Sequence, residues 1–292
     1  MLAGHCRAES AGVEVKAEPF VADFYCVKSS IPKPGILLLG GSEGGRPNGR
    51  LPDFLASNGW AVLAVAYFRD KGLPPSLQMI PLEYFDAPLA WMNHNANIRP
   101  GGVLVMGGSK GAELALLLAS KRPAIRAVIA VAPSSVVWVG MQDSGWPADS
   151  LSSWTFHGKP VPFLPLDYCR RFDTHDPLAA VKLLKAALDQ KELVKKTSIR
   201  VEKINGPILL LSGKADEIWP SAQMADALCE RLRTKHFRFK YENVQYADAG
   251  HTLHEHGNFG GTPEGNAKAG SDAKLRILAF LRAAAGQIGA PH

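Results

Sequence analysis

The sequence is poor in cysteine and has no long apolar run. Its 292 residues include four cysteines, which form no CxxC pair, and this argues against a disulfide framework. No apolar stretch approaches the roughly 18 residues of a membrane-spanning helix, and no secretory signal follows Met1. These absences predict a soluble, cytoplasmic protein with reduced thiols and no membrane span.

The charge balance is modest as well. The chain carries 33 Lys and Arg against 27 Asp and Glu, a formal net charge of +6, which slightly favours anionic partners. It has no zinc-finger spacing and no basic stripe interleaved with aromatics, so we expect no nucleic-acid partner. With 46% hydrophobic and 21% charged residues, the composition excludes disorder, collagen and coiled coil.

Most of the chain alternates short apolar runs with helical patterns. Strands are expected at 36–39, 60–67, 103–106, 125–131, 208–211 and 237–242, after one or two edge strands within 12–27. Helices are expected at 51–58, 82–94, 110–121, 221–234 and 272–285. This β-α-β alternation predicts an α/β fold with a mostly parallel central sheet and helices on both faces.

The alternation is interrupted at 134–205, which we interpret as a cap or lid inserted into a core of 1–133 and 206–292. A helix is expected there with Asp176 as its N-cap and Pro177 at its first position. The aromatic residues of the insertion are candidates for lining a substrate pocket, although such residues usually build an insertion's own core. They are Trp138, Trp146, Trp154, Phe156 and Phe163.

The most informative stretch is 107–111, Gly-Gly-Ser-Lys-Gly, between an expected strand and an expected helix. A G-x-S-x-G turn in this setting is typical of a nucleophile elbow, in which the serine is strained and the glycines prevent clashes. The turn would expose the Ser109 hydroxyl and aim the Lys110 amide at an oxyanion. The alternative is a glycine turn that merely packs a helix on a sheet.

A candidate acid and base follow in the chain order Ser, Asp, His. Asp216 comes just after an apolar strand, and His251 lies on a loop after the next one, at the strand ends where open α/β sheets place active groups. Serine needs an imidazole to take its proton, and the imidazole needs a carboxylate behind it. We expect Ser109, His251 and Asp216 to form a triad, with Glu217 and Asp248 as alternative acids.

A second oxyanion donor is expected in the loop 40–45, after the first apolar strand. We favour the amide of Ser42 or Gly41, alongside that of Lys110. The alternative is a plain turn between a strand and a helix. A phosphate-binding loop is excluded because no Gly-Lys-Ser/Thr follows.

Three histidines lie close together in the sequence, His251, His254 and His256. There is no HExxH motif and no carboxylate at helical spacing, so we expect no metal site. A Ser-His-Asp mechanism needs no cofactor, and we expect none.

With these residues in place, the chain resembles the family of acyl-CoA thioesterases and bile acid-CoA:amino acid N-acyltransferases, in its α/β-hydrolase catalytic domain. The most specific matching run is Ser-Lys-Gly-Ala-Glu-Leu-Ala at 109–115. Further matching stretches lie at 34–41, 56–64, 81–85, 132–137, 201–204 and 250–251. The resemblance implies an α/β-hydrolase fold with Ser109 as nucleophile, Asp216 as acid and His251 as base. Because the nucleophile is serine in the thioesterases and cysteine in the bile-acid transferase, it also points to hydrolysis.

We therefore expect a serine hydrolase that cleaves acyl thioesters, with acyl-CoA as the expected substrate. Alternatives are a carboxylesterase or dienelactone-hydrolase-like esterase, an acyl-CoA:amino acid N-acyltransferase, and a non-catalytic binding protein that keeps the fold. A homo-oligomer is also compatible with the sequence. Two basic clusters are candidates for contacting CoA phosphates, although charge runs are usually solvated faces. They are Arg231, Arg233, Lys235, Arg238 and Lys240, and Lys182, Lys185, Lys191, Lys195 and Lys196.

Overall fold

The computed structural model describes residues 12–16, 18–142, 151–166, 176, 178–253 and 259–287. The main strands are β1 (Val13–Glu14), β2 (Val21–Tyr25), β3 (Lys33–Leu39), β4 (Ala61–Ala66), β6 (Ile98–Gly108), β7 (Ile125–Val131), β10 (Ile208–Gly213) and β11 (Tyr241–Tyr246). The helices of the core are α1 (Arg50–Ser57), α2 (Asp86–His94), α3 (Lys110–Ala119), α6 (Ser221–Thr234) and α7 (Pro263–Gln287), with a 3-10 turn η1 (Leu82–Phe85) before α2.

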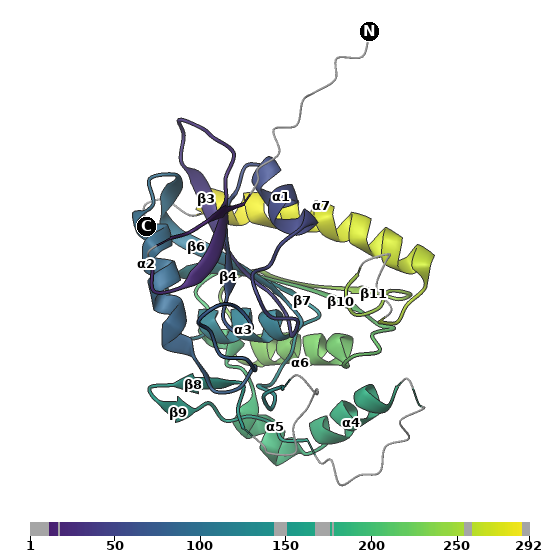
Figure 1. Ribbon diagram of the computed structural model, residues 1–292. Coiled ribbons are helices and arrows are strands. Elements are labelled where there is room, and N and C mark those ends of the chain that lie inside the picture. Colours follow the sequence, from purple (N-terminus) through teal and green to yellow (C-terminus); the bar gives the residue numbers. More distant parts are fainter. Residues whose placement is uncertain are drawn as a thin grey trace.

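The described strands build an eight-stranded sheet in the order β1-β2-β4-β3-β6-β7-β10-β11. The pairs from β4 to β11 are parallel, and β2 and β1 add an antiparallel edge. In Figure 1, α1 and α7 lie on one side of this sheet and α3 and α6 on the other. The prediction of a mostly parallel sheet covered on both faces is confirmed.

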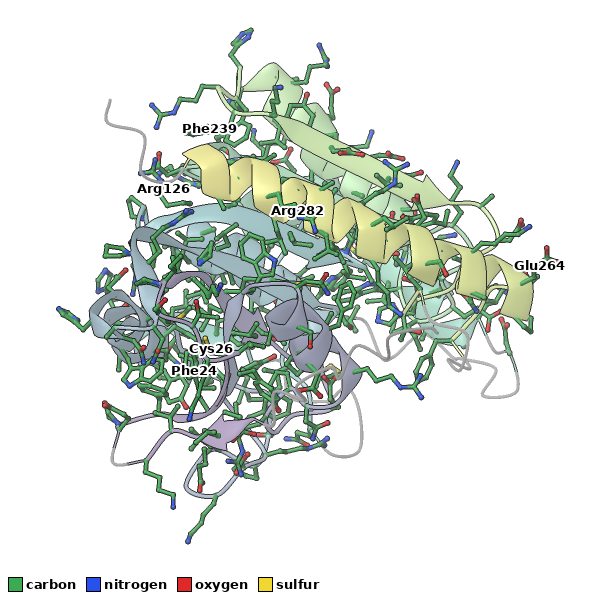
Figure 2. All side chains as sticks on the ribbon, turned by 90° about the horizontal axis from the view of Figure 1, so that it is seen from above. Phe24, Cys26, Arg126, Phe239, Glu264 and Arg282 are labelled. Atoms are coloured by element: carbon green, nitrogen blue, oxygen red, sulfur yellow. The ribbon has the colours of Figure 1, made fainter. Side chains whose placement is uncertain are left out.

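The central strands are apolar throughout because helices cover both of their faces. In β3, Ile36 and Leu38 pack in the core that includes α7, whereas Leu37 and Leu39 pack in the core that includes α3. Figure 2 shows α7 lying across the sheet, with Glu264 at one end and Arg282 toward the other. Helix α3 is enclosed along its whole length, since every residue from Lys110 to Ala119 is buried.

Two expected elements near the end of the chain were misplaced. The last strand is β11, not 237–242, because the register of the sheet pairs Ile208 with Tyr241. The last helix begins at Pro263, not at Asp272. Gly265 and Gly270 weaken its helical signal, yet a side chain at either position would press on the neighbouring chain at 248 or 253. Close packing therefore favours glycine there.

The insertion between β7 and β10 contains β8 (Trp154–Phe156), β9 (Lys159–Pro160), α4 (Ala179–Leu188), α5 (Lys191–Thr197) and the 3-10 turn η2 (Val201–Lys203). In Figure 1 it lies beyond α3 and α6, on the side away from the sheet. Strand β8 also pairs with β5 (Ile80–Pro81) of the expected core, so the boundaries at 134 and 205 stay predictions. Helix α4 begins at Ala179, with Leu178 in the N-cap position, so the helix starts later than predicted. Asp176 Oδ1 nevertheless accepts the Leu178 N–H (2.9 Å), the kind of hydrogen bond that a capping side chain makes. Pro177 lies outside the described residues.

Among the residues that the structure describes, no helix combines the length and the apolar character that crossing a membrane requires.

Candidate active site

Ser109 lies at the bend between β6 and α3, with a left-handed backbone (φ 55°, ψ −122°). A Cβ at Gly107 would lie 2.1 Å from the carbonyl oxygen of Gly111, and one at Gly111 would lie 2.3 Å from that of Gly40. Only glycine fits these two positions. A Cβ at Gly108, in contrast, would meet no atom within 4 Å. The elbow thus has no room for a side chain at its two outer glycines, whereas the position next to the serine does have room for one.

The structure brings Ser109, His251 and Asp216 together. The Ser109 Oγ lies 2.8 Å from Nε2 of His251, and Nδ1 of that ring lies 2.9 Å from Oδ2 of Asp216. With its proton on Nδ1, the imidazole donates to the carboxylate and accepts from the serine hydroxyl. Trp219 and Phe259 contact the ring edge-on, with centroids 5.8 and 6.5 Å away. His251 is 7% exposed and Asp216 8%, whereas Ser109 is half-buried.

The carboxylate of Asp216 is held from several sides. Its Oδ1 accepts the backbone N–H groups of Ile218 (2.9 Å) and Trp219 (3.1 Å), and its Oδ2 accepts the hydroxyl of Ser221 (2.6 Å). These donors fix the carboxylate in the orientation that faces the imidazole. Ser221 begins α6 and had no signal in the sequence beyond its closeness to Asp216.

The loop that carries His251 is anchored by α7. Asn266, 4% exposed, accepts the N–H of Gly250 (2.8 Å) and donates its amide to the carbonyl of Gly260 (3.1 Å). The N–H of His251 donates to the carbonyl of Phe259 (3.0 Å). Sequence reasoning missed Asn266 because the helix was expected to begin after it.

The two alternative acids make different contacts. The backbone N–H of Glu217 donates to the carbonyl of Phe259 (3.4 Å), and the carbonyl of Asp248 accepts the N–H of Thr262 (2.9 Å). Within the described residues, neither side chain hydrogen-bonds to His251. Asp216 is the acid that the geometry favours.

The loop expected to supply the second oxyanion donor lies against the elbow. A Cβ at Gly41 would lie 3.4 Å from that of Ser109. The loop is pinned by two side chains, since Glu43 Oε1 accepts the Gly41 N–H (2.7 Å) and the Tyr67 hydroxyl donates to the carbonyl of Gly40 (2.6 Å). Burial raises the pKa of Tyr67 well above its usual range, so its hydroxyl remains a donor.

The candidate oxyanion amides differ in whether their N–H groups already have an acceptor. The Gly41 N–H is engaged by Glu43, which argues against Gly41 as the donor. In the described part of the chain, the N–H groups of Ser42 and Lys110 donate to no protein acceptor. Ser42 and Lys110 therefore remain the candidate oxyanion donors, and that role stays a prediction.

The expected pocket aromatics have the contacts of interior residues. Trp138 and Trp154 have fully buried side chains, and the Trp154 Nε1–H donates to Glu113 Oε1 (2.7 Å). Phe156 is half-buried, with the Lys121 Nζ 4.1 Å from its ring centroid. Trp146 lies outside the described residues. A role for these residues in lining a substrate pocket stays a prediction.

The basic clusters are partly neutralised. Arg231 pairs with Glu202 (2.6 Å) and Lys182 with Asp176 (2.6 Å), as on ordinary solvated faces. Lys235 lines a hollow of about 450 Å³ that includes no residue of the Ser-His-Asp set. A contact with CoA phosphates at either cluster stays a prediction.

A metal site has no support among the described side chains, where no group of three or more potential ligands gathers. Both ring nitrogens of His251 already face Asp216 and Ser109. His254 and His256 lie outside the described residues.

Several proteins with related sequences are named acyl-coenzyme A thioesterases. Human (Homo sapiens) acyl-coenzyme A thioesterase 1 is 30% identical over 223 residues, which cover 76% of this chain and 49% of that protein. Mouse (Mus musculus) acyl-coenzyme A thioesterase 6 is 30% identical over 270 residues, covering 85% of this chain and 59% of its own. The chain thus spans about half the length of the curated relatives it matches.

Solved structures with low sequence identity share the fold. A dienelactone hydrolase from Klebsiella pneumoniae superposes with a TM-score of 0.56 at 16% identity, covering 92% of this chain and 99% of that one. A puromycin-hydrolyzing peptidase from Mycobacterium tuberculosis gives 0.62 at 13% identity, covering 99% and 41%. The α/β-hydrolase fold is confirmed.

A family model agrees with both comparisons. The family described as "BAAT / Acyl-CoA thioester hydrolase C terminal" matches residues 80–287, a range that includes the elbow, Asp216 and His251. By this match, the chain belongs to the BAAT / acyl-CoA thioester hydrolase C-terminal family.

Proposed function

We propose that the chain is a serine hydrolase that cleaves acyl thioesters, with acyl-CoA as the substrate class and Ser109 as the nucleophile. The observation that carries this proposal is the continuous hydrogen-bonded series from Ser109 through His251 to Asp216. The names of the related thioesterases support the choice of substrate.

In the first half of the reaction, the Ser109 Oγ attacks the thioester carbonyl and its proton passes to Nε2 of His251. The carbonyl oxygen becomes an anion, for which the amides of Lys110 and Ser42 are the available donors. Asp216 stabilises the imidazolium that forms. Collapse of the tetrahedral intermediate breaks the C–S bond, and the imidazolium proton goes to the departing sulfur to give a thiol.

In the second half, water attacks the acyl-Ser109 ester while His251 accepts one of its protons. Collapse of the second intermediate releases the carboxylic acid and returns the proton to Ser109. One water is consumed for each thioester cleaved, and no redox partner or metal takes part. An amine in place of water would give an amide, which is the chemistry of the alternative N-acyltransferase.

The proposal is tested by kinetics on a panel of acyl-CoAs of different chain lengths and on oxygen esters of the same acyl groups. Ser109→Ala should lower kcat by about 10⁴-fold or more. Ser120→Ala, at the other end of α3, is the control and should keep full activity. Undiminished hydrolysis of every substrate by Ser109→Ala would refute the proposal.

The same panel separates the alternatives. A higher kcat/KM for oxygen esters than for thioesters would indicate an esterase, and an amide formed with added glycine or taurine would indicate an acyltransferase. A fluorophosphonate probe should label Ser109, because only an activated serine reacts. Absence of labelling would indicate a non-catalytic binding protein.

Location and assembly stay predictions. Cys26 and Cys229 are free thiols, as expected in a reducing compartment, and Cys6 and Cys169 lie outside the described residues. The related proteins include two named mitochondrial, human and mouse acyl-coenzyme A thioesterase 2. A homo-oligomer is checked by the mass of the protein in solution.

A further inference from the structure

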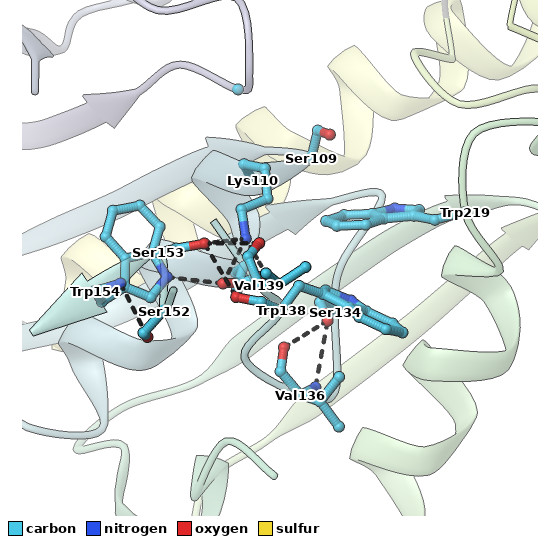
Figure 3. A network of polar contacts seen from close by, with 12 residues as sticks. Ser109, Lys110, Ser134, Val136, Trp138, Val139, Ser152, Ser153, Trp154 and Trp219 are labelled. Atoms are coloured by element: carbon cyan, nitrogen blue, oxygen red, sulfur yellow. Dashed lines mark hydrogen bonds and ion pairs between the residues drawn. The ribbon is translucent and has the colours of Figure 1, made fainter. Parts of the chain in front are cut away.

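Helix α3 buries an ion pair directly beneath the elbow. The Lys110 Nζ lies 2.8 Å from both carboxylate oxygens of Glu113, and the two side chains are 1% and 0% exposed. Figure 3 shows the Lys110 side chain extending away from Ser109, toward Ser153 and Trp154. The reaction proposed above uses the backbone of Lys110 and leaves this pair without a role.

The pair is completed by the insertion. The Ser153 Oγ lies 2.8 Å from the Lys110 Nζ, and the Trp154 Nε1–H donates to Glu113 (2.7 Å). The Ser153 hydroxyl also lies within 3.1 Å of the carbonyl of Trp138. Lys110 and Glu113 therefore neutralise each other's charge, and each makes a further hydrogen bond to the segment around β8 (Figure 3).

Such a pair is not explained by stability alone. Burial lowers the pKa of Lys110 and raises that of Glu113, while each partner's charge opposes the change. Each group therefore depends on the other to stay charged. Apolar residues of similar volume often replace a buried pair with no loss of stability, so its position in the first turn of α3 invites a role in the site.

The first turn of α3 carries one candidate oxyanion donor and packs against the start of the loop that holds the other. It carries the Lys110 amide, and its next residue, Gly111, packs against the carbonyl of Gly40, from which a Cβ would be only 2.3 Å away. The Gly40 carbonyl leads into the loop that holds Ser42. A small displacement of this turn would move both amides relative to Ser109, and misplacement by about 1 Å can lower a rate 100-fold.

We propose that Lys110 and Glu113 are positioning residues, which fasten the first turn of α3 to Ser153 and Trp154 and so hold the oxyanion donors in register with Ser109. This inference rests on the proposed function. The insertion is then a structural support of the oxyanion site, in addition to any part it has in covering the substrate.

The test replaces the pair by apolar side chains, Lys110→Met with Glu113→Leu. We expect a folded protein whose kcat, counted per fluorophosphonate-reactive site, falls about 10-fold or more, with KM within about threefold, as loss of a transition-state interaction requires. The rate constant for labelling Ser109 should fall in parallel, because the probe also develops charge on an oxygen beside the serine. The control is Lys268→Gln with Glu264→Gln, an exposed ion pair of α7 with i,i+4 spacing, which should leave both rates unchanged.

A second variant separates the effect of the hydrogen bond to the insertion from the effect of the ion pair itself. Ser153→Ala keeps Lys110 and Glu113 and removes one tether, and we expect a smaller fall in kcat, by about threefold to tenfold. If the double variant does not fold, this variant decides alone. A kcat and labelling rate within twofold of wild type, in whichever variant decides, would overturn the positioning role. If wild type itself neither hydrolyses thioesters nor labels, the proposed function fails instead.

Discussion

The two halves of the candidate site are held by different means. The serine half is one continuous stretch, whose bend brings backbone so close to positions 107 and 111 that only glycine fits there. The histidine half depends on Asn266 and Phe259, which reach His251 and its neighbour from other parts of the chain. A turn defined by sterics can be recognised in a sequence, whereas a loop held by distant hydrogen bonds cannot.

The difference also concerns how each half should fail. The serine half is held by contacts that a single added methyl group would violate, so a change there should disrupt the fold. The histidine half is held by individual hydrogen bonds of modest net strength, so changes there should lower activity in proportion to the bond removed. The following predictions test this contrast.

Asp216→Asn should have the largest effect on rate within the histidine half. The amide no longer selects the imidazole tautomer that accepts the serine proton, and a loss in kcat on the order of 10⁴ is expected for such a change. The measurement is kcat on acyl-CoA. Asp248→Asn is the control and should stay near wild type; equal losses in both would reopen the choice of acid.

Gly111→Ala should break the serine half through the fold. Its Cβ would lie 2.3 Å from the Gly40 carbonyl, and we expect a loss of about 3 kcal/mol in unfolding free energy. Gly108→Ala is the matched control, because a Cβ there meets nothing within 4 Å. Urea unfolding of both variants measures the contrast, and equal stability of the two would contradict the steric account of the elbow.

Asn266→Ala should show the graded failure of the histidine half. It removes an acceptor from the Gly250 N–H and a donor from the Gly260 carbonyl, for which we expect a loss of about 1–3 kcal/mol. A fall in kcat of about 10-fold should accompany it, because the His251 loop loses its anchor. Lys268→Ala, on the exposed side of the same helix, should change neither quantity. Unchanged kcat in Asn266→Ala would argue against the anchoring role.

The smallest effect, on the free energy of unfolding, should come from the ion pair between Glu202 and Arg231, which lies outside both halves of the site. Burial raises the pKa of Glu202, but its contacts with Arg231 outweigh burial and leave that pKa lowered. A carboxyl group whose pKa is lower in the folded protein than in the unfolded one stabilises the fold at pH values above its unfolded pKa, which is about 4.3. This stabilisation is lost as the pH falls through the pKa of the folded state. Between about pH 5 and 3, wild type should lose about 0.5–1 kcal/mol more than Glu202→Gln, measured by urea unfolding. Parallel curves would show that the pair contributes nothing.

The same contrast explains what the sequence could predict. The elbow, the sheet and α6 follow from local patterns, and α6 occupies the expected residues, Ser221–Thr234. Asp216 and His251 could be predicted because each follows the end of a strand. This holds even though the bounds predicted for the strand before His251 were wrong. Strand β11 was misplaced because the aromatic run from Phe237 reads as a strand, whereas the sheet register begins at Tyr241.

The contacts that support the site were beyond prediction. Lys110 and Glu113 lie in the most recognisable run of the sequence, yet their respective partners, Ser153 and Trp154, come from a segment with no clear pattern. The engagement of the Gly41 amide by Glu43 depends on one side-chain rotation within the loop. Such interactions are set by tertiary packing, and periodicity and turn chemistry do not report them.

The absence of a side chain at Gly108 has a practical consequence. This position is adjacent to Ser109 and its Cβ direction is open, while the residues that define the bend are Gly107 and Gly111. Bulk can therefore be introduced beside the serine without touching the bend. A graded series of alanine, valine and leucine at Gly108 would therefore test whether added bulk beside the serine changes the acyl-chain preference of the proposed reaction.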